Sequence, residues 1–138
     1  MEQENFKKLL NTNLLPLAFI GDSVHTLFVR EKALSNPNRK IENYHSFASI
    51  YCKASSQAKA LEAISPLLTE EEQEIVRRGR NAKPKHTAKN ASSADYAHAT
   101  AFEVLVGYLY LSENKERLEE ILNLSIEAVD LKGKTNVN

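Results

Sequence analysis

The stretch LAFIGDSV, residues 17–24, is apolar except where Gly21, Asp22 and a serine interrupt it. Pro16 stands before it, where a first-turn proline is tolerated, and apolar residues recur at helical spacing as far as about Leu34. This spacing predicts a helix. A glycine inside a helix costs about 1 kcal/mol relative to alanine, and a carboxylate resists burial, so something should offset both. Asp22 lies around the helix from the apolar stripe, and a merely solvated acid is as compatible with the spacing as a functional one.

The remainder of the chain also shows helical patterns. Thr69 and Glu72 have the spacing of a capping box, which predicts that a helix begins there. The further predicted helices span about 41–64, about 70–79, about 94–112, and a last segment with Leu118, Ile121, Leu122, Ile126 and Val129. Because nothing alternates as a strand does, we expect an all-α fold, a single domain over residues 1–138 with a frayed tail at 132–138.

Composition restricts the possible functions. The 138 residues suffice for one domain but not for a catalytic domain plus a separate recognition domain. Eighteen basic and eighteen acidic residues give no net charge, so any affinity for nucleic acid must come from local clustering of charge. The single Cys52 cannot form an intrachain disulfide, and neither a secretory signal nor a membrane-spanning apolar stretch is present. We therefore expect a cytoplasmic protein that does not interact with membranes.

A second isolated carboxylate lies in the helix predicted at 94–112. Glu103 is flanked by Phe102 and Val104 in a nearly continuous apolar run. It either faces solvent along a narrow polar strip or meets a partner within the fold. If that partner is Asp22, two carboxylates share a cleft, and like charges at close range require a proton or a cation. Mg²⁺ is the cation that suits carboxylates and waters.

A basic segment follows the acidic helix start at residues 70–74. Residues 77–90 contain six basic residues and no acidic one, and we expect a surface loop from about 80 to 93. The segment could simply be a solvated loop that balances the acidic turn. Its length and lack of apolar residues favour contact with phosphates.

Three motifs resemble a known family. Residues 17–24 resemble the signature helix of the ribonuclease III catalytic domain. The run 78–83 (RGRNAK), Lys89-Asn90 and the run 100–111 (TAFEVLVGYLYL) resemble Mini-ribonuclease III, a bacterial branch without a double-stranded-RNA-binding domain. The motifs occur in the family's order and the resemblance covers nearly the whole chain.

This resemblance implies a specific function. It implies a homodimer that cleaves double-stranded RNA with Mg²⁺ and no organic cofactor, in the maturation of large-subunit (23S) ribosomal RNA precursor ends. By motif, Asp22 and Glu103 are the catalytic residues and metal ligands. Two further acidic positions of full-length ribonuclease III correspond to Ala18 and Thr100 here, which leaves the number of ions open. The expected RNA-binding residues are Arg77, Arg78, Arg80, Asn81, Lys83, Lys85, Lys89 and Asn90.

Two other functions remain as alternatives. The first is a non-catalytic helical module that binds RNA or a ribosomal partner through the basic segment, with Asp22 and Glu103 only solvated or capping. The second is a helical metal-dependent phosphohydrolase that acts on nucleotides. Such enzymes usually carry His-Asp pairs or Glu-x-x-Glu arrays, and neither occurs around the two carboxylates.

Overall fold

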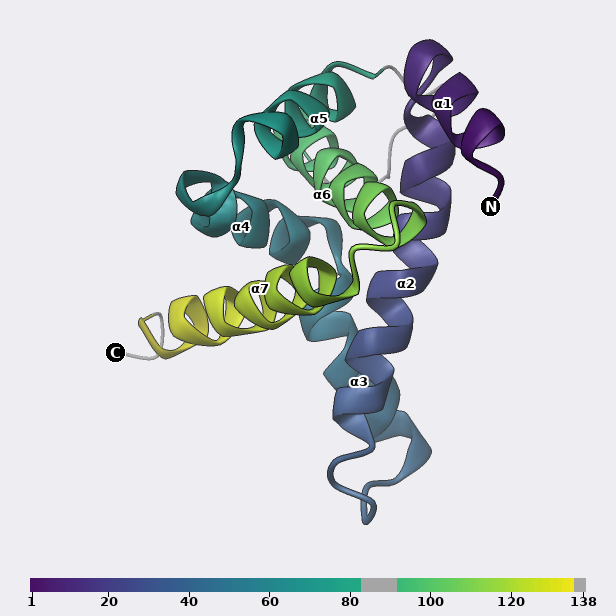
Figure 1. Cartoon of the computed structure of the whole chain (residues 1–138). Coiled ribbons are helices and arrows are strands. Elements are labelled where there is room, and N and C mark those ends of the chain that lie inside the picture. Colours follow the sequence, from purple (N-terminus) through teal and green to yellow (C-terminus); the bar gives the residue numbers. More distant parts are fainter. Residues whose placement is uncertain (83–91, 136–138) are drawn as a thin grey trace.

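A computed structural model describes residues 1–82 and 92–135, with side chains as far as residue 131. The described residues form helices and no strand (Figure 1), so the predicted all-α fold class is confirmed. None of these helices combines the length and the apolar character needed to cross a bilayer. The helices are α1 (Gln3–Thr12), α2 (Leu15–Ala33), α3 (Ile41–Cys52), α4 (Ala54–Ile64), the 3-10 turn η1 (Ser65–Leu67), α5 (Glu70–Asn81), α6 (Ser93–Leu111) and α7 (Lys115–Thr135).

Helix α6 is the centre of the molecule. It packs against α2, α4, α5 and α7, and α2 runs past it and continues alongside α3 (Figure 1). Phe102, Leu105 and Leu109 of α6 are almost completely buried in the main core, which α4 and α7 complete. Because other helices surround α6 on most sides, nearly all of its faces carry apolar side chains. The carboxyl group of Glu103 is an exception within this apolar helix.

Two glycines allow α2 and α6 to cross at backbone contact. A Cβ on Gly21 would overlap the carbonyl oxygen of Glu103 and lie 2.9 Å from the amide nitrogen of Gly107. A Cβ on Gly107 would in turn overlap the carbonyl oxygen of Leu17. Each glycine therefore faces the backbone of the other helix, and this close approach explains why α2 tolerates a glycine in its interior.

The buried side of α2 differs from the predicted apolar stripe. Its buried residues recur every fourth position and include a glycine, a histidine and an alanine: Leu17, Gly21, His25, Val29 and Ala33. Leu27 is one of the apolar residues that recur at helical spacing along this segment, yet it is 61% exposed. Close packing against α6 requires small side chains at the crossing, and this tertiary contact determines which face of α2 is buried.

The predicted single helix over 41–64 is wrong, because the structure divides it into α3 and α4. The break lies at Lys53, whose backbone is extended (φ −68°, ψ 154°). The Ser56 hydroxyl donates a hydrogen bond to the Ile50 carbonyl, so a side chain satisfies an acceptor at the end of α3. The change of direction lets α4 pack against both α6 and α7.

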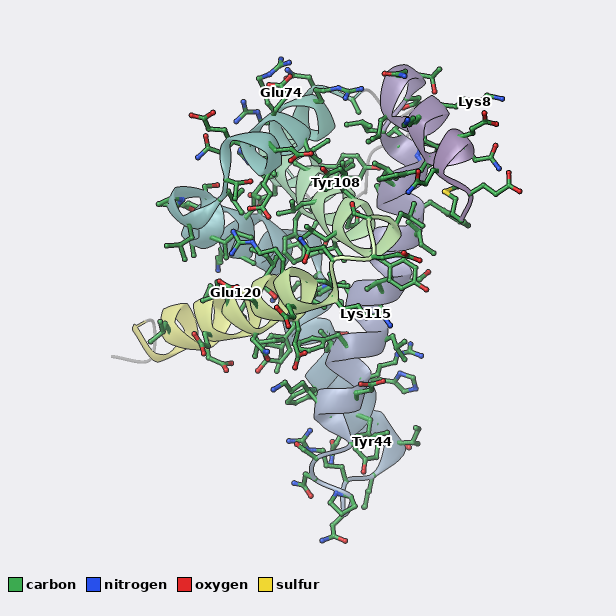
Figure 2. All side chains as sticks on the ribbon, in the orientation of Figure 1. Lys8, Tyr44, Glu74, Tyr108, Lys115 and Glu120 are labelled. Carbon is green, nitrogen blue, oxygen red and sulfur yellow. The ribbon has the colours of Figure 1, made fainter. Side chains whose placement is uncertain are left out.

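The chain ends also differ from expectation. Helix α1 was not predicted; it packs through Phe6, Leu9 and Leu10 against the start of α2. The Phe6 ring lies 6.0 Å from that of Tyr108, which reaches from α6 toward α1 (Figure 2). At the other end, α7 continues to Thr135, three residues beyond the start of the predicted frayed tail.

The predicted capping box is present and links α5 to α7. The Thr69 hydroxyl accepts from the Glu72 amide, and the Glu72 carboxylate accepts from the Thr69 amide. The same carboxylate, 5% exposed, binds Arg117 of α7 with two hydrogen bonds, at 2.7 and 2.9 Å. This bond to Arg117 is the main reason that the pKa of Glu72 is lowered.

We predict that Gly21→Ala destabilises the protein by about 3 kcal/mol or more, because the added methyl group meets backbone that has no room to move. The melting temperature should fall by about 10 °C, measured by circular dichroism. Glu31→Ala, at an exposed position of the same helix, is the control and should have little effect. Equal melting temperatures for the two variants would mean that the backbones of α2 and α6 are far enough apart at the crossing to accommodate a methyl group.

Candidate active site

The crossing of α2 and α6 brings Asp22 and Glu103 together. Asp22 follows the glycine that contacts the α6 backbone at Glu103, so the backbone contact fixes where both carboxyl groups project. The two carboxyl groups lie close enough for each to affect the ionisation of the other. Asp22 is exposed and Glu103 is partly buried, so the pair opens to solvent on the Asp22 side. Of the two interpretations that the sequence left open for Glu103, the structure favours a partner within the fold.

The electrostatics of this pair are unusual. Burial raises the pKa of Glu103 to about 8, and the nearby Asp22 carboxyl group acts in the same direction. The pair therefore holds one proton near neutral pH in the cation-free protein. Such a pair can exchange that proton for a metal cation, because a cation neutralises the carboxylate charges that burial and mutual repulsion disfavour.

Two buried polar side chains lie next to the pair and were missed by sequence reasoning. Gln57 of α4 contacts the Glu103 carboxyl, and its Nε2 lies 3.1 Å from Nδ1 of His25. Burial lowers the pKa of His25 to about 4, so its ring is neutral at pH 7. The sequence did contain a sign that Gln57 is buried. It stands three residues after Ala54 and four before Leu61, which places it on the apolar face of its helix.

Cys52 completes the surroundings. Its thiol is half-buried, interacts with the Thr26 hydroxyl and feels the charges of Asp22 and Glu103. Burial raises the pKa of the thiol, so Cys52 is a neutral group at the edge of the site rather than a metal-binding thiolate.

The donors present fit a hydrated hard cation. In the described part of the chain, no cluster of three or more histidine, cysteine or acidic side chains could hold a metal. The Thr100 hydroxyl donates to the carbonyl of Tyr96 in its own helix, 2.9 Å away, and Ala18 has no polar side chain, so neither position adds a carboxylate. Mg²⁺ keeps several waters and commonly binds one or two carboxylates together with substrate phosphates, so two carboxylates match it.

The predicted RNA-binding residues fall into three groups. Arg77 pairs with Glu74 in the same helix, with Nε 2.9 Å from Oε2, and Arg78 donates to the carbonyl of Leu10, which ties α1 to α5. Arg80 and Asn81 are exposed at the end of α5. Lys83, Lys85, Lys89 and Asn90 lie outside the described residues.

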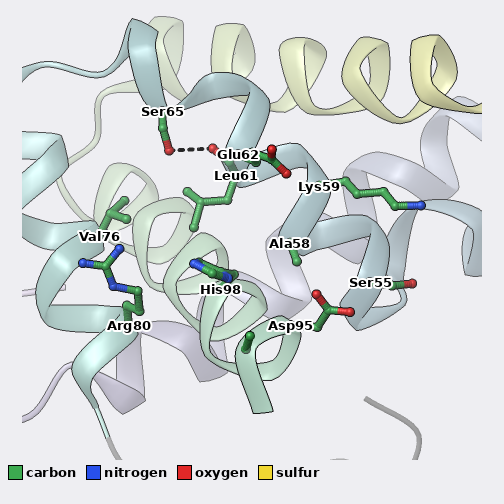
Figure 3. A pocket seen from close by; sticks show the side chains of 11 residues that line it. Ser55, Ala58, Lys59, Leu61, Glu62, Ser65, Val76, Arg80, Asp95 and His98 are labelled. Carbon is green, nitrogen blue, oxygen red and sulfur yellow. Dashed lines mark hydrogen bonds between the residues drawn. The ribbon is translucent and has the colours of Figure 1, made fainter. Parts of the chain in front are cut away.

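A cleft of about 410 Å³ lies elsewhere, between α4, α5 and α6 (Figure 3). Lys59, Arg80 and His98 border it together with Glu62 and Asp95, so it is bordered by groups of both charges. Neither Asp22 nor Glu103 lines it. The carboxylate pair, rather than this cleft, has the chemistry of a reaction centre.

A model of the ribonuclease III domain matches residues 15–114, which include both carboxylates. The chain belongs to the ribonuclease III family. Within this family it is similar to Mini-ribonuclease 3 of Brevibacillus brevis (44% identical, over 94% of this chain and 98% of the relative). Mini-ribonuclease 3 of Thermoanaerobacter sp. is 43% identical over 88% and 86% of the two chains. The resemblance that the motifs suggested is thus confirmed.

The three-dimensional arrangement agrees with this membership. A crystal structure of a Fusobacterium nucleatum protein superposes with a TM-score of 0.77 and 27% identity, over 85% of this chain and 93% of that one. The predicted single ribonuclease III-like helical fold is therefore present. The family match begins at α2 and ends at the α6–α7 turn, so it covers the helices that carry the carboxylate pair.

We predict that Glu103→Gln stabilises the cation-free ribonuclease III fold at alkaline pH. Below pH 4.5 the glutamate is protonated in both folded and unfolded chains, so parent and variant should be equally stable. Between pH 4.5 and about 8 only the unfolded chain loses the proton, and the parent loses stability relative to the variant. The difference should approach about 5 kcal/mol above pH 8, measured by urea unfolding in a chelator. A difference independent of pH would contradict the raised pKa.

Proposed function

We propose that the chain is a Mg²⁺-dependent endoribonuclease whose reaction centre is the pair Asp22 and Glu103. The observation that carries this proposal is the close approach of two carboxyl groups from separate helices, fixed by the backbone contact at Gly21, with the pKa of Glu103 raised to about 8. Two acids in such contact require a proton or a cation. As a member of its family, the chain is an endoribonuclease of the ribonuclease III type that acts on double-stranded RNA.

The chain's own residues divide the work at this site. Asp22 and Glu103 hold the ion through their carboxylates, and the exposed Asp22 faces the approaching RNA. An ion held there would supply an activated water for attack on the phosphodiester and would neutralise charge on the departing oxygen. The neutral His25 and the protonated Cys52 add no charge that would compete with the cation. Gly21 and Gly107 keep the two helices at the separation that the carboxylates need.

The basic segment is proposed to contact the RNA. Double-stranded RNA is recognised mainly through phosphates, 2′-hydroxyls and groove shape, which suits arginine, lysine and asparagine. Among the described residues, Arg80 and Asn81 are exposed and can reach a phosphate. Arg78 is less available, because its guanidinium donates a hydrogen bond to the Leu10 carbonyl. Lys83, Lys85, Lys89 and Asn90 are proposed to extend this surface, with Arg77 at its edge.

We propose that the protein works as a homodimer in which the exposed side of α2 contacts the second copy. Phe19 on that side is 82% exposed, an unusual position for a large aromatic ring, and it stands one turn before Asp22. A dimer also doubles the RNA-binding surface and gives one site for each strand. The molar mass in solution, by light scattering, tests this, and a monomer at micromolar concentration would contradict it.

The cellular substrate is proposed to be the double-stranded ends of large-subunit (23S) ribosomal RNA precursors in the cytoplasm, without an organic cofactor. This part of the proposal rests on the Mini-ribonuclease 3 relatives. Mapping of the cleaved ends on precursor RNA tests it. Cleavage at positions unrelated to the mature ends would contradict it.

We expect the purified protein to cleave long double-stranded RNA in Mg²⁺ and to lose activity in a chelator. Asp22→Asn and Glu103→Gln each remove a charge that binds the cation, so each should lower the cleavage rate at least about 1000-fold, measured on end-labelled RNA.

The control for this assay is Ser23→Ala, an exposed neighbour of Asp22, which should cleave at the parent's rate. If the parent leaves RNA intact while still binding it, the non-catalytic RNA-binding module becomes the better description. Release of phosphate or pyrophosphate from nucleotides would instead favour a phosphohydrolase.

For RNA binding we predict that the double variant Arg80→Ala with Lys85→Ala binds about tenfold more weakly, measured by fluorescence anisotropy in Ca²⁺. The slope of log affinity against log salt should fall by about one for each phosphate that the variant no longer neutralises. Lys40→Ala with Lys115→Ala removes the same charge from other exposed positions and is the matched control. Equal weakening by both pairs would show that only the overall charge matters.

A further inference from the structure

The buried pair His25 and Gln57 is a polar feature that the fold itself does not require. Gln57 is 3% exposed and His25 2% exposed, on α4 and α2. Burying an amide and an imidazole is costly unless they are hydrogen-bonded, and apolar side chains of similar volume would fill the same space without that cost. A pair that is retained at this cost next to the carboxylates calls for a functional explanation.

The chemistry of the two groups fixes the direction of their hydrogen bond. The His25 ring is neutral at pH 7, and the Gln57 amide nitrogen can only donate. At a distance of 3.1 Å, Nε2 of Gln57 therefore donates to Nδ1 of His25, which places the ring proton on Nε2 of His25. One of the two amide hydrogens of Gln57 is thus used, and the orientation of its amide plane is set.

The second amide hydrogen is available to Glu103. The Gln57 side chain lies within interaction range of the Glu103 carboxyl, and the remaining amide hydrogen is the donor that it can offer to a carboxylate oxygen. A single amide nitrogen can in this way bridge the ring of His25 on one side and the carboxylate on the other. The amide is therefore a fixed support rather than a group that rotates freely.

The His25 ring is itself held in place by α6. It stands edge-on to the ring of Phe102, with centroids 5.0 Å apart and an interplanar angle of 84°. Phe102 is fully buried and directly precedes Glu103. The chain of contacts therefore begins and ends on α6, and it runs through α2 and α4 between these two neighbouring residues.

We propose that Gln57 is a positioning residue whose amide, locked by His25, orients the Glu103 carboxylate to bind the divalent cation. This inference rests on the proposed function, since it assumes that the cation binds at Asp22 and Glu103. Groups that hydrogen-bond to metal ligands usually set ligand orientation, and their loss typically weakens metal binding by about 10- to 100-fold. Gln57 itself touches neither RNA nor the ion.

The test measures cation binding directly, without RNA. Gln57→Met keeps the volume and removes both donors, and Mn²⁺ binding to the parent and to this variant is measured by isothermal titration calorimetry. We expect the dissociation constant to rise about tenfold in the variant. In cleavage assays, kcat at low Mg²⁺ should fall and recover at high Mg²⁺, while KM for RNA stays unchanged.

Two further variants separate a positioning role from a structural one. Ser56→Ala removes the neighbouring buried hydroxyl of α4, whose hydrogen bond to Ile50 is structural, and should lower the melting temperature without changing the Mn²⁺ affinity. His25→Phe preserves the ring against Phe102 but removes the acceptor for Gln57. It should weaken Mn²⁺ binding by about threefold, and it keeps the proposal testable if Gln57→Met fails to fold.

The possible results are distinguishable. If the parent binds Mn²⁺, Glu103→Gln does not, and Gln57→Met binds as the parent does, the positioning role is wrong and the proposed function stands. If Gln57→Met fails to fold, parent-like Mn²⁺ binding by His25→Phe overturns the role instead. If the parent binds no divalent cation, both proposals are overturned.

Discussion

The contact between the backbones of α2 and α6 is the constraint on which the other features depend. Gly21 meets the backbone at Glu103, and Gly107 meets the backbone at Leu17, so the two helices touch without side chains between them. This contact sets the spacing of Asp22 and Glu103 more rigidly than side-chain packing could, because backbone atoms in helices cannot rearrange. It also brings His25 under α6, where α4 supplies Gln57. The proposed reaction centre is thus a consequence of how closely two helices can approach.

The site combines features that destabilise the protein with features that suit a cation. Two acids in contact, a glycine in a helix and a buried amide all oppose folding to some degree. The surroundings compensate through the apolar core around α6 and through links such as Glu72 to Arg117, which lie away from the carboxylates. The destabilising polar groups are therefore concentrated around the carboxylate pair, and the contacts that stabilise the fold lie elsewhere. This separation is expected where function and stability compete.

Sequence reasoning identified the two carboxylates because each interrupts an apolar helix, and it located α2, α5 and α6 because their patterns and caps are local. It did not find the break at Lys53, where neither proline nor glycine marks the end of α3. Since that break decides where α4 packs, the contact of Gln57 with Glu103 could not be predicted either. The burial of His25 and the exposure of Leu27 were missed for a related reason. Packing against α6, which is distant in sequence, determines which face of α2 is buried.

The paired glycines also affect how this chain can change. Any amino-acid substitution at either position adds at least a methyl group, so neither glycine has a harmless replacement, and substitutions there should be eliminated by selection. The exposed end of α5, at Arg80 and Asn81, faces solvent and is held by no such backbone contact. Libraries built to alter the enzyme's preferences should therefore keep the crossing invariant and concentrate their diversity at that end of α5, where altered side chains can appear without loss of the scaffold.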